Sequence, residues 1–148
     1  MTIRLGGQGE GYRVIDITEA WAGPFSTSLL GDLGAEVVRI ESFPRVARGM
    51  PAQAQAGTGA TTGGNLVGGP DSPHPWDRAS AYHMTNRNKL GITLNLADTR
   101  GKDIFYRLVA KSDALVIGFT AGTISRMGID YEILREHSLM MLLGSMNA

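Results

Sequence analysis

The sequence contains no cysteine, which excludes disulfide bonds, thiolate catalysis and cysteine-ligated zinc sites. It also lacks a long apolar run, because no stretch approaches the ~20 residues that a membrane-spanning helix needs. The sequence has no excess of positive or negative charge, because 14 Lys and Arg residues balance 14 Asp and Glu residues. A broad nucleic-acid surface needs a basic excess. We therefore expect a protein that binds neither nucleic acid nor membrane.

The amino-terminal segment, residues 1–11, has no apolar core of the kind that signal peptides carry. It is polar and glycine-rich, which predicts a flexible tail in a cytoplasmic protein. Histidine is scarce, and His74, His83 and His137 do not have the spacing of metal ligands. We expect no metal site.

A second segment, from about residue 42 to 79, has too few apolar residues to form a core. Glycine and proline are frequent, and Ala, Gln and Thr fill much of the rest, which predicts a long loop or a partly disordered segment. Its glycines at 57–64 lack the strand and the Gly-Lys-Ser/Thr ending of a phosphate-binding loop. The glycines at 6–11 likewise lack the context of a dinucleotide-binding fingerprint, so we reject both interpretations.

The first pattern typical of regular secondary structure is Val14–Phe25. It predicts a buried strand, a turn of small residues and the start of a helix. Ala22 and Gly23 leave the backbone uncovered, and Pro24 suits the first position of a helix. A helix that begins this way points backbone N–H groups at one spot and favours an anionic ligand there. The alternative is a plain strand-to-helix turn in an α/β core.

Alternating α and β patterns predict an α/β fold with a parallel sheet, because a strand–helix–strand unit of this size forms a right-handed parallel crossover. The helix at 25–33 is predicted to bury Phe25, Leu29, Leu30 and Leu33 and to end at Gly34 in a left-handed cap. A later helix, capped by Asp98 or Thr99, is predicted to bury Ile104, Phe105, Leu108 and Val109. Strands are predicted at 13–17, 35–41, 90–96, 114–117 and 139–143, with further helical segments at 123–127 and 131–136 after Asp130.

Three sequence segments follow one another along the chain: Val14–Glu41, Asn86–Leu96 and Asp113–Tyr131. In this order they resemble the class III CoA-transferase family, which includes formyl-CoA, carnitine and bile-acid CoA-transferases. The α-methylacyl-CoA racemase shares the pattern. The resemblance covers about residues 13–148 apart from the glycine-rich segment. It implies a Rossmann-like open parallel sheet flanked by helices. Residues 12–148 would then form an incomplete amino-terminal part of the family's large domain.

The resemblance also implies covalent catalysis by an aspartate, which attacks an acyl-CoA thioester and then carries CoA to a carboxylic acid. In the family this aspartate follows a glycine-rich segment beyond the strand that here ends near Ser145–Ala148. No aspartate of this chain matches it, so no catalytic residue is assigned and the chain alone is expected to be inactive. Asp16, inside the first strand, is expected to bond to neighbouring backbone.

The resemblance assigns part of a CoA-binding site to this chain. Trp21 would either stack on the CoA or lie in the core, and Phe119 has the same two interpretations. Arg126 would bind a CoA phosphate or lie solvated at a helix end. The polar cluster at 86–89 would hold phosphates or solvate a turn. The expected CoA-binding residues are Glu19, Ala20, Trp21, Ala22, Asn86, Arg87, Asn88, Lys89, Phe119 and Arg126.

CoA and acyl-CoA are expected as substrates rather than as a permanently bound cofactor. The expected partners are acyl-CoA, a carboxylic acid acceptor, and either a second copy in the interlocked homodimer of the family or the rest of a longer chain. Two alternatives stay open. One is an acyl-CoA racemase or isomerase of the same lineage, and the other is a non-catalytic CoA-binding or assembly module.

Overall fold

The computed structural model describes residues 11–19, 21–42, 80–129, 132, 134 and 140–143. Within this part of the chain, five parallel strands form one sheet in the order β3-β2-β1-β4-β5. The order reverses between β1 and β4, as in a Rossmann-like sheet, which confirms the predicted fold class. The strands are β1 (Arg13–Ile17), β2 (Glu36–Glu41), β3 (Lys89–Thr93), β4 (Ala114–Ile117) and β5 (Met140–Leu143).

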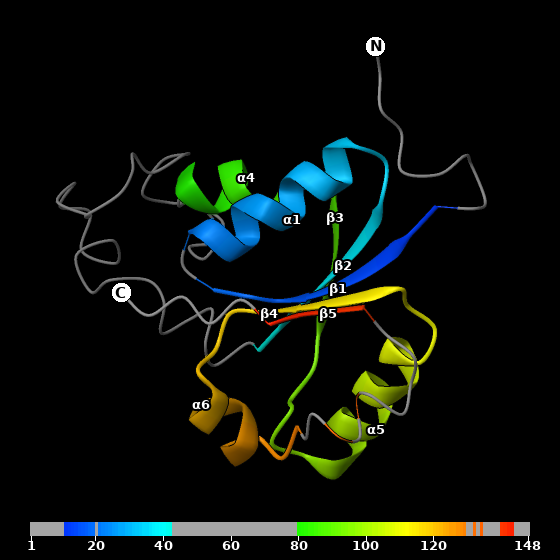
Figure 1. The fold of residues 1–148 in the computed structure, drawn as a ribbon. Coiled ribbons are helices and arrows are strands. Elements are labelled where there is room, and N and C mark those ends of the chain that lie inside the picture. The colour runs from blue at the N-terminus through cyan, green and yellow to red at the C-terminus, as the bar shows by residue number, and fades with distance from the viewer. Residues whose placement is uncertain are drawn as a thin grey trace, which may run out of the picture.

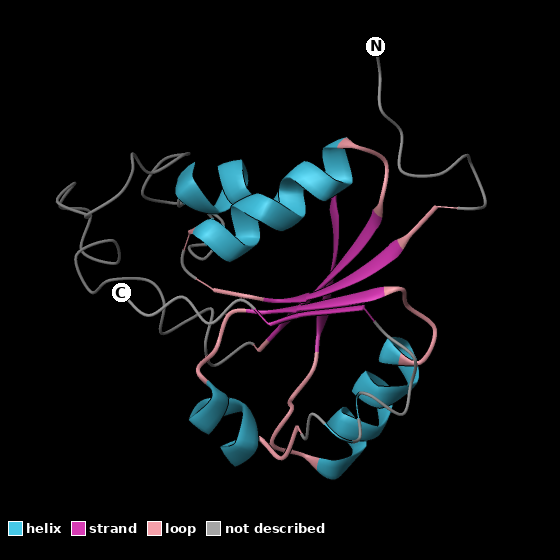
Figure 2. Cartoon of the chain, viewed as in Figure 1, coloured by secondary structure: helices cyan, strands magenta, loops and turns pink. Residues whose placement is uncertain are grey.

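The helices cover both faces of this sheet. Figure 1 shows α1 (Ala22–Asp32) and α4 (Ser80–Asn86) on one face and α5 (Thr99–Val109) and α6 (Ala121–Arg126) on the other. The resulting three layers are clear when the elements are coloured by type (Figure 2). Among the described residues, no helix is both long enough and apolar enough to cross a bilayer.

The face of the sheet under α5 and α6 holds the main apolar core. Ile15 and Leu115 are fully buried there, and α5 contributes Phe105 and Val109, which are also fully buried. The prediction that Ile104 is buried is wrong, because its side chain is 42% exposed. The buried side of α5 runs through positions 101, 105 and 109, and Ile104 lies to one side of that line.

The opposite face is different, and the predicted buried side of α1 is wrong except at Leu30, which is partly buried against apolar residues of the sheet. Phe25, Leu29 and Leu33 are 38%, 44% and 37% exposed, whereas the helix buries Pro24, Thr27 and Ser28. The reason is that much of the sheet under α1 is polar. Small side chains with hydroxyl groups can bond to such a surface, whereas leucine and phenylalanine cannot.

Several boundaries also differ from the prediction. α1 begins at Ala22, three residues early, and Pro24 is its third residue; this costs no helical bond, because the first N–H groups of a helix have no partner within it. β3 spans Lys89–Thr93 and ends three residues before the predicted boundary. The predicted left-handed cap at Gly34, after the end of α1, is confirmed by its φ of 100°. Residues 1–10, most of the predicted loop (43–79) and most of the helix predicted at 131–136 lie outside the described residues.

Candidate functional site at the strand-order reversal

The candidate site lies at the carboxyl ends of β1 and β4, the neighbouring strands between which the order of the sheet reverses. The chain leaves β1 toward α1 on one face and leaves β4 toward α6 on the other (Figure 1). In open parallel sheets this divergence forms the crevice in which ligands bind. The predicted residues Glu19, Trp21 and Ala22 follow β1, and Phe119 follows β4, so the sheet brings these two groups to one edge.

The two turns lie directly against each other. The Gly118 N–H donates to the Ile17 carbonyl oxygen at 3.4 Å, which extends the β1–β4 contact beyond the last strand residues. A Cβ atom at Gly118 would lie 3.0 Å from the Thr18 Cα and 3.2 Å from the Glu19 nitrogen. Glycine at 118 therefore permits an approach of the two backbones that any side chain would obstruct.

The start of α1 offers backbone rather than side chains. Ala22 and Gly23 occupy its first turn, which contains no acidic residue, and Trp21 at the cap position makes no side-chain capping bond. Helix N–H groups in such a turn are available to an anion. The interpretation of Trp21 as a core residue is wrong, because its side chain is 49% exposed. Ala20 lies outside the described residues.

The two CoA-binding residues predicted after β4, Phe119 and Arg126, differ in burial. Phe119 is half-buried and packs against the apolar core, as its packing interpretation expects. Arg126 is exposed at the end of α6, where its Nη2 donates to the Thr123 Oγ1 at 3.1 Å. Arg126 is the last residue of α6, five helical steps or about 7.5 Å along the axis from Ala121, the first residue of that helix.

The predicted polar cluster at 86–89 is not brought to this edge as a unit. Arg87 and Asn88 bind the carboxylate of Asp32 at the far end of α1, through Arg87 Nη2 at 2.5 Å and Asn88 Nδ2 at 2.7 Å. The eleven residues of α1 separate that carboxylate from the Trp21 turn by about 16 Å. The Arg87 hydrogen bond lowers the pKa of Asp32, and Asn88 acts in the same direction. Asn86 and Lys89 instead contribute to the contacts beneath α1.

Lys89 meets Asp16 under the first turns of α1. The Lys89 Nζ lies 2.9 Å from the Asp16 Oδ2 and donates to the Pro24 carbonyl oxygen at 2.7 Å and the Asn86 Oδ1 at 3.1 Å. The Lys89 and Asp16 side chains are 2% and 0% exposed. Burial lowers the pKa of Lys89, although the negative charge of Asp16 opposes that shift.

Asp16 accepts bonds at both carboxylate oxygens. Its Oδ1 accepts from the Thr18 backbone N–H at 2.9 Å and from the Thr18 hydroxyl at 2.6 Å, while its Oδ2 also accepts from the Thr27 hydroxyl at 2.7 Å. The prediction that Asp16 bonds to neighbouring backbone is confirmed. A fully buried carboxylate with its lone pairs engaged in this way is a poor nucleophile.

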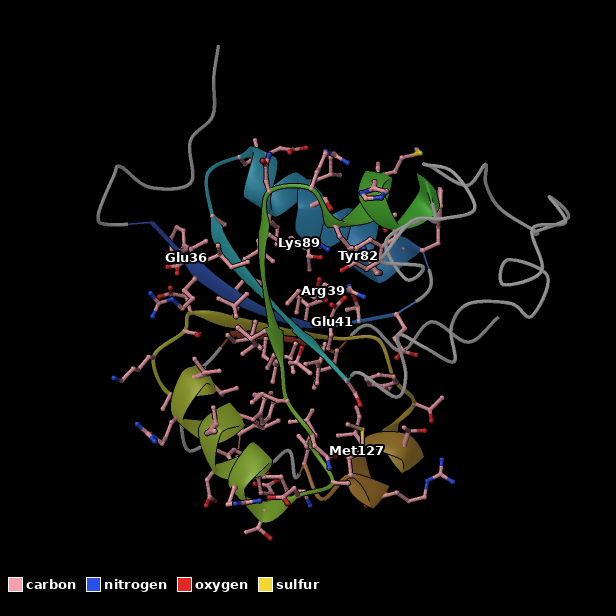
Figure 3. The ribbon with its side chains drawn as sticks, turned by 180° about the vertical axis from the view of Figure 1, so that it is seen from behind. Glu36, Arg39, Glu41, Tyr82, Lys89 and Met127 are labelled. Atoms are coloured by element: carbon pink, nitrogen blue, oxygen red, sulfur yellow. The ribbon has the colours of Figure 1, made fainter. Side chains whose placement is uncertain are left out.

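The polar contacts continue toward α4 (Figure 3). Arg39 Nη1 lies 3.7 Å from the Asp16 Oδ2, and Arg39 Nε donates to the Glu41 Oε1 at 2.7 Å. The Tyr82 hydroxyl donates to the same Glu41 oxygen at 2.9 Å. We call these five residues, Asp16, Arg39, Glu41, Tyr82 and Lys89, the buried polar cluster.

The sequence prediction missed Arg39, Glu41 and Tyr82, and it expected Lys89 to hold a phosphate or to solvate a turn. A signal was present in β1 and β2. Parallel strands that helices cover on both faces read as nearly continuous apolar runs. Asp16, Arg39 and Glu41 interrupt two such runs, and charged residues in covered strands need partners. That pattern could have indicated a paired charge cluster, although it does not identify Lys89 as the partner.

Comparison with known proteins identifies the family to which this arrangement belongs. The profile described as CoA-transferase family III matches residues 10–148. The chain belongs to CoA-transferase family III. It is 37% identical over 127 residues to a formyl-CoA:oxalate CoA-transferase from Streptomyces avermitilis, and 35% identical over 127 residues to a human succinyl-CoA:glutarate CoA-transferase. Each match covers 86% of this chain, but only 26% and 25% of the respective relatives.

Two solved structures agree with the fold. A CAIB/BAIF family protein from Brucella suis superposes with a TM-score of 0.65 at 27% identity, covering 88% of this chain and 31% of that one. The protein Rv3272 from Mycobacterium tuberculosis gives a TM-score of 0.64 at 28% identity, with the same two coverages. The chain thus spans about a quarter of the length of the curated family III relatives named above, and corresponds to the amino-terminal part of the family fold.

Proposed function

We propose that this chain is the amino-terminal CoA-binding segment of an acyl-CoA:carboxylate CoA-transferase. The observation that carries the proposal is the contact between the turns after β1 and β4 at the strand-order reversal, where Gly118 lies against Thr18. The open first turn of α1 faces a ligand with backbone N–H groups, and the exposed Trp21 offers a surface for stacking. Phosphate groups and an adenine ring are the chemical features of CoA that fit such donors and such a surface.

In this proposal the chain binds the CoA thioester but supplies no nucleophile. Asp16 is buried with both oxygens occupied, and it makes the bonds of a structural carboxylate. The aspartate that forms the acyl intermediate and the residues that choose the carboxylic acid acceptor would belong to parts of the enzyme other than this chain. We therefore expect CoA binding without transfer, and transfer by this chain alone would contradict the proposal.

The proposed partners also include another polypeptide surface, either a second copy, as in the interlocked dimer expected from the resemblance, or the remainder of a longer chain. Support comes from the exposed apolar residues of α1, which an isolated domain leaves in water. A cytoplasmic location remains a prediction.

Calorimetric titration with CoA tests the proposed site, with dephospho-CoA as a second ligand that reports the contribution of the terminal phosphate. A Gly118→Val variant is expected to weaken CoA binding, because its side chain would force the two turns apart. The matched control is Gly91→Val on the edge strand β3, where an added Cβ meets no atom within 4 Å. Equal CoA affinity in the two variants would contradict the proposed location.

A further inference from the structure

Lys89 and Asp16 occupy an unusual position relative to the candidate site, because both are buried and yet both bond to the segment that forms it. Asp16 binds the backbone N–H and hydroxyl of Thr18, the first residue after β1. Lys89 binds the carbonyl oxygen of Pro24 in the first turn of α1. The pair therefore holds the β1–α1 turn at both of its ends.

We propose that the Asp16–Lys89 pair is a positioning device that fixes the β1–α1 turn for CoA. This inference rests on the proposed function, and it assigns Lys89 a role other than phosphate contact. The Lys89 side chain is 2% exposed, and its ammonium group already has three oxygen partners: Asp16, Pro24 and Asn86. An ammonium group has three protons to donate, so these partners use its full capacity.

The geometry of the pair explains why charge is needed at this place. A neutral side chain at 89 could not satisfy Asp16, whose Oδ2 accepts from Lys89 Nζ and Thr27 Oγ1. Without Lys89, the buried Asp16 carboxylate would keep the Arg39 guanidinium as an ion-pair partner, but Arg39 Nη1 at 3.7 Å is too distant for a hydrogen bond and would leave the carboxylate short of a charged donor. Lys89 thereby supplies a charged hydrogen-bond donor that orients Asp16, and Asp16 in turn orients Thr18.

The turn is also packed tightly enough to transmit this ordering. A Cβ atom at Gly23 would lie 2.6 Å from the Thr18 Cβ, and one at Gly118 would lie 3.0 Å from the Thr18 Cα. Thr18 is thus enclosed by α1 on one side and by the turn after β4 on the other, and its own exposure is only 3%. A shift of Thr18 would displace both halves of the candidate site together.

Hydrogen exchange of the full 148-residue chain tests the inference without any ligand, and calorimetry with CoA tests its consequence. In Lys89→Met, we expect the amides of residues 18, 19 and 21–23 to exchange about tenfold faster and CoA to bind about tenfold more weakly, the scale of one lost charge-assisted hydrogen bond. The control is Arg13→Met, which removes the Arg13–Glu36 ion pair (2.8 Å) at the opposite end of β1. It should leave both readouts unchanged.

A double variant, Asp16→Asn with Lys89→Met, separates positioning from general stability and guards against a single variant that does not fold. It leaves no unpaired carboxylate at position 16, so the exchange of the core amides of β1 and β4 should recover. The turn should still exchange faster than in the wild type, because the bond to the Pro24 carbonyl stays lost. Recovery of the turn together with the core would overturn the inference and leave a structural role only.

The remaining outcomes are also decisive. Weaker CoA binding in Lys89→Met with unchanged turn exchange would mean direct contact with CoA and would overturn the positioning role. If the wild-type chain binds no CoA, the proposed function fails for this chain, while the exchange of the turn still decides whether the Asp16–Lys89 pair fixes it.

Discussion

At the scale of single residues, the chain places two ion pairs at opposite ends of α1 in different surroundings. Lys89 and Asp16 are buried beneath its first turns, whereas Arg87 and Asp32 are 39% and 33% exposed at its last turn. Exposed pairs contribute little to stability because water screens them, while a buried pair is costly to break. The two pairs should therefore respond differently to pH and to substitution.

The first prediction concerns Lys89 and alkaline pH. Burial lowers its pKa below the usual 10.5, despite the nearby carboxylates of Asp16 and Glu41, and Arg39 acts in the same direction as burial. The unfolded chain then binds more protons than the folded protein between the lowered pKa and 10.5. The contribution of Lys89 to the free energy of unfolding should rise with pH across that window and be lost as the pH falls through the lowered pKa.

Urea unfolding of the wild type and Lys89→Met at a series of pH values measures this contribution. The stability difference, wild type minus variant, should increase from neutral pH toward 10.5, and a decrease would contradict the sign. The exposed Lys111 supplies the control, since Lys111→Met removes a lysine that lies outside the buried polar cluster.

The second residue-scale prediction concerns Asp32. Its pKa is lowered chiefly by the Arg87 hydrogen bond, so Arg87→Met should raise that pKa toward the ordinary value of 3.8. The side-chain carboxyl resonance in an NMR titration reports the change directly. The midpoint of thermal unfolding at neutral pH should hardly move, because the pair is exposed. An unchanged Asp32 titration would show that Asn88 alone maintains the shift.

At the scale of elements, the two long helices use their apolar residues in opposite ways. Phe105 on α5 is fully buried, whereas Phe25 on α1 is 38% exposed beside the Arg87 guanidinium, 5.8 Å from its ring centre. Phe105→Ala should lower the free energy of unfolding by about 3–5 kcal/mol. Phe25→Ala should lower the free energy of unfolding by no more than about 1 kcal/mol. Chemical denaturation measures both, and equal losses would contradict the observed orientation of α1.

The same contrast explains what the sequence could predict. The bounds of β1 and β4, the cap at Asp98 and the parallel crossovers follow from short-range patterns, and all are confirmed. The buried side of α1 was not predictable by counting apolar residues, because it depends on the polarity of the sheet beneath it. The buried position of Lys89 was not predictable either, because its partner Asp16 lies 73 positions away in the sequence and no local pattern contains that contact.

At the scale of the whole molecule, α1 keeps a stripe of exposed apolar side chains, of which Phe25 lies beside the Arg87 guanidinium. Trp21, Phe25, Leu29 and Leu33 are spaced four residues apart, so they lie near one another along one side of the helix. The relatives in family III are about four times as long as the matched segment, which leaves ample chain to cover such a surface.

The isolated chain should therefore self-associate through the exposed side of α1. Multi-angle light scattering is expected to show oligomers that shift toward monomer in Leu29→Lys, because a charge in that stripe would have to be desolvated on association. Ile104→Lys is the matched control, since Ile104 on α5 is 42% exposed, nearly the same as the 44% of Leu29, but lies on the opposite face of the sheet. An equal response of both variants would place the association elsewhere. A wild-type chain that is monomeric at every concentration would mean that this stripe is too small to drive association in water.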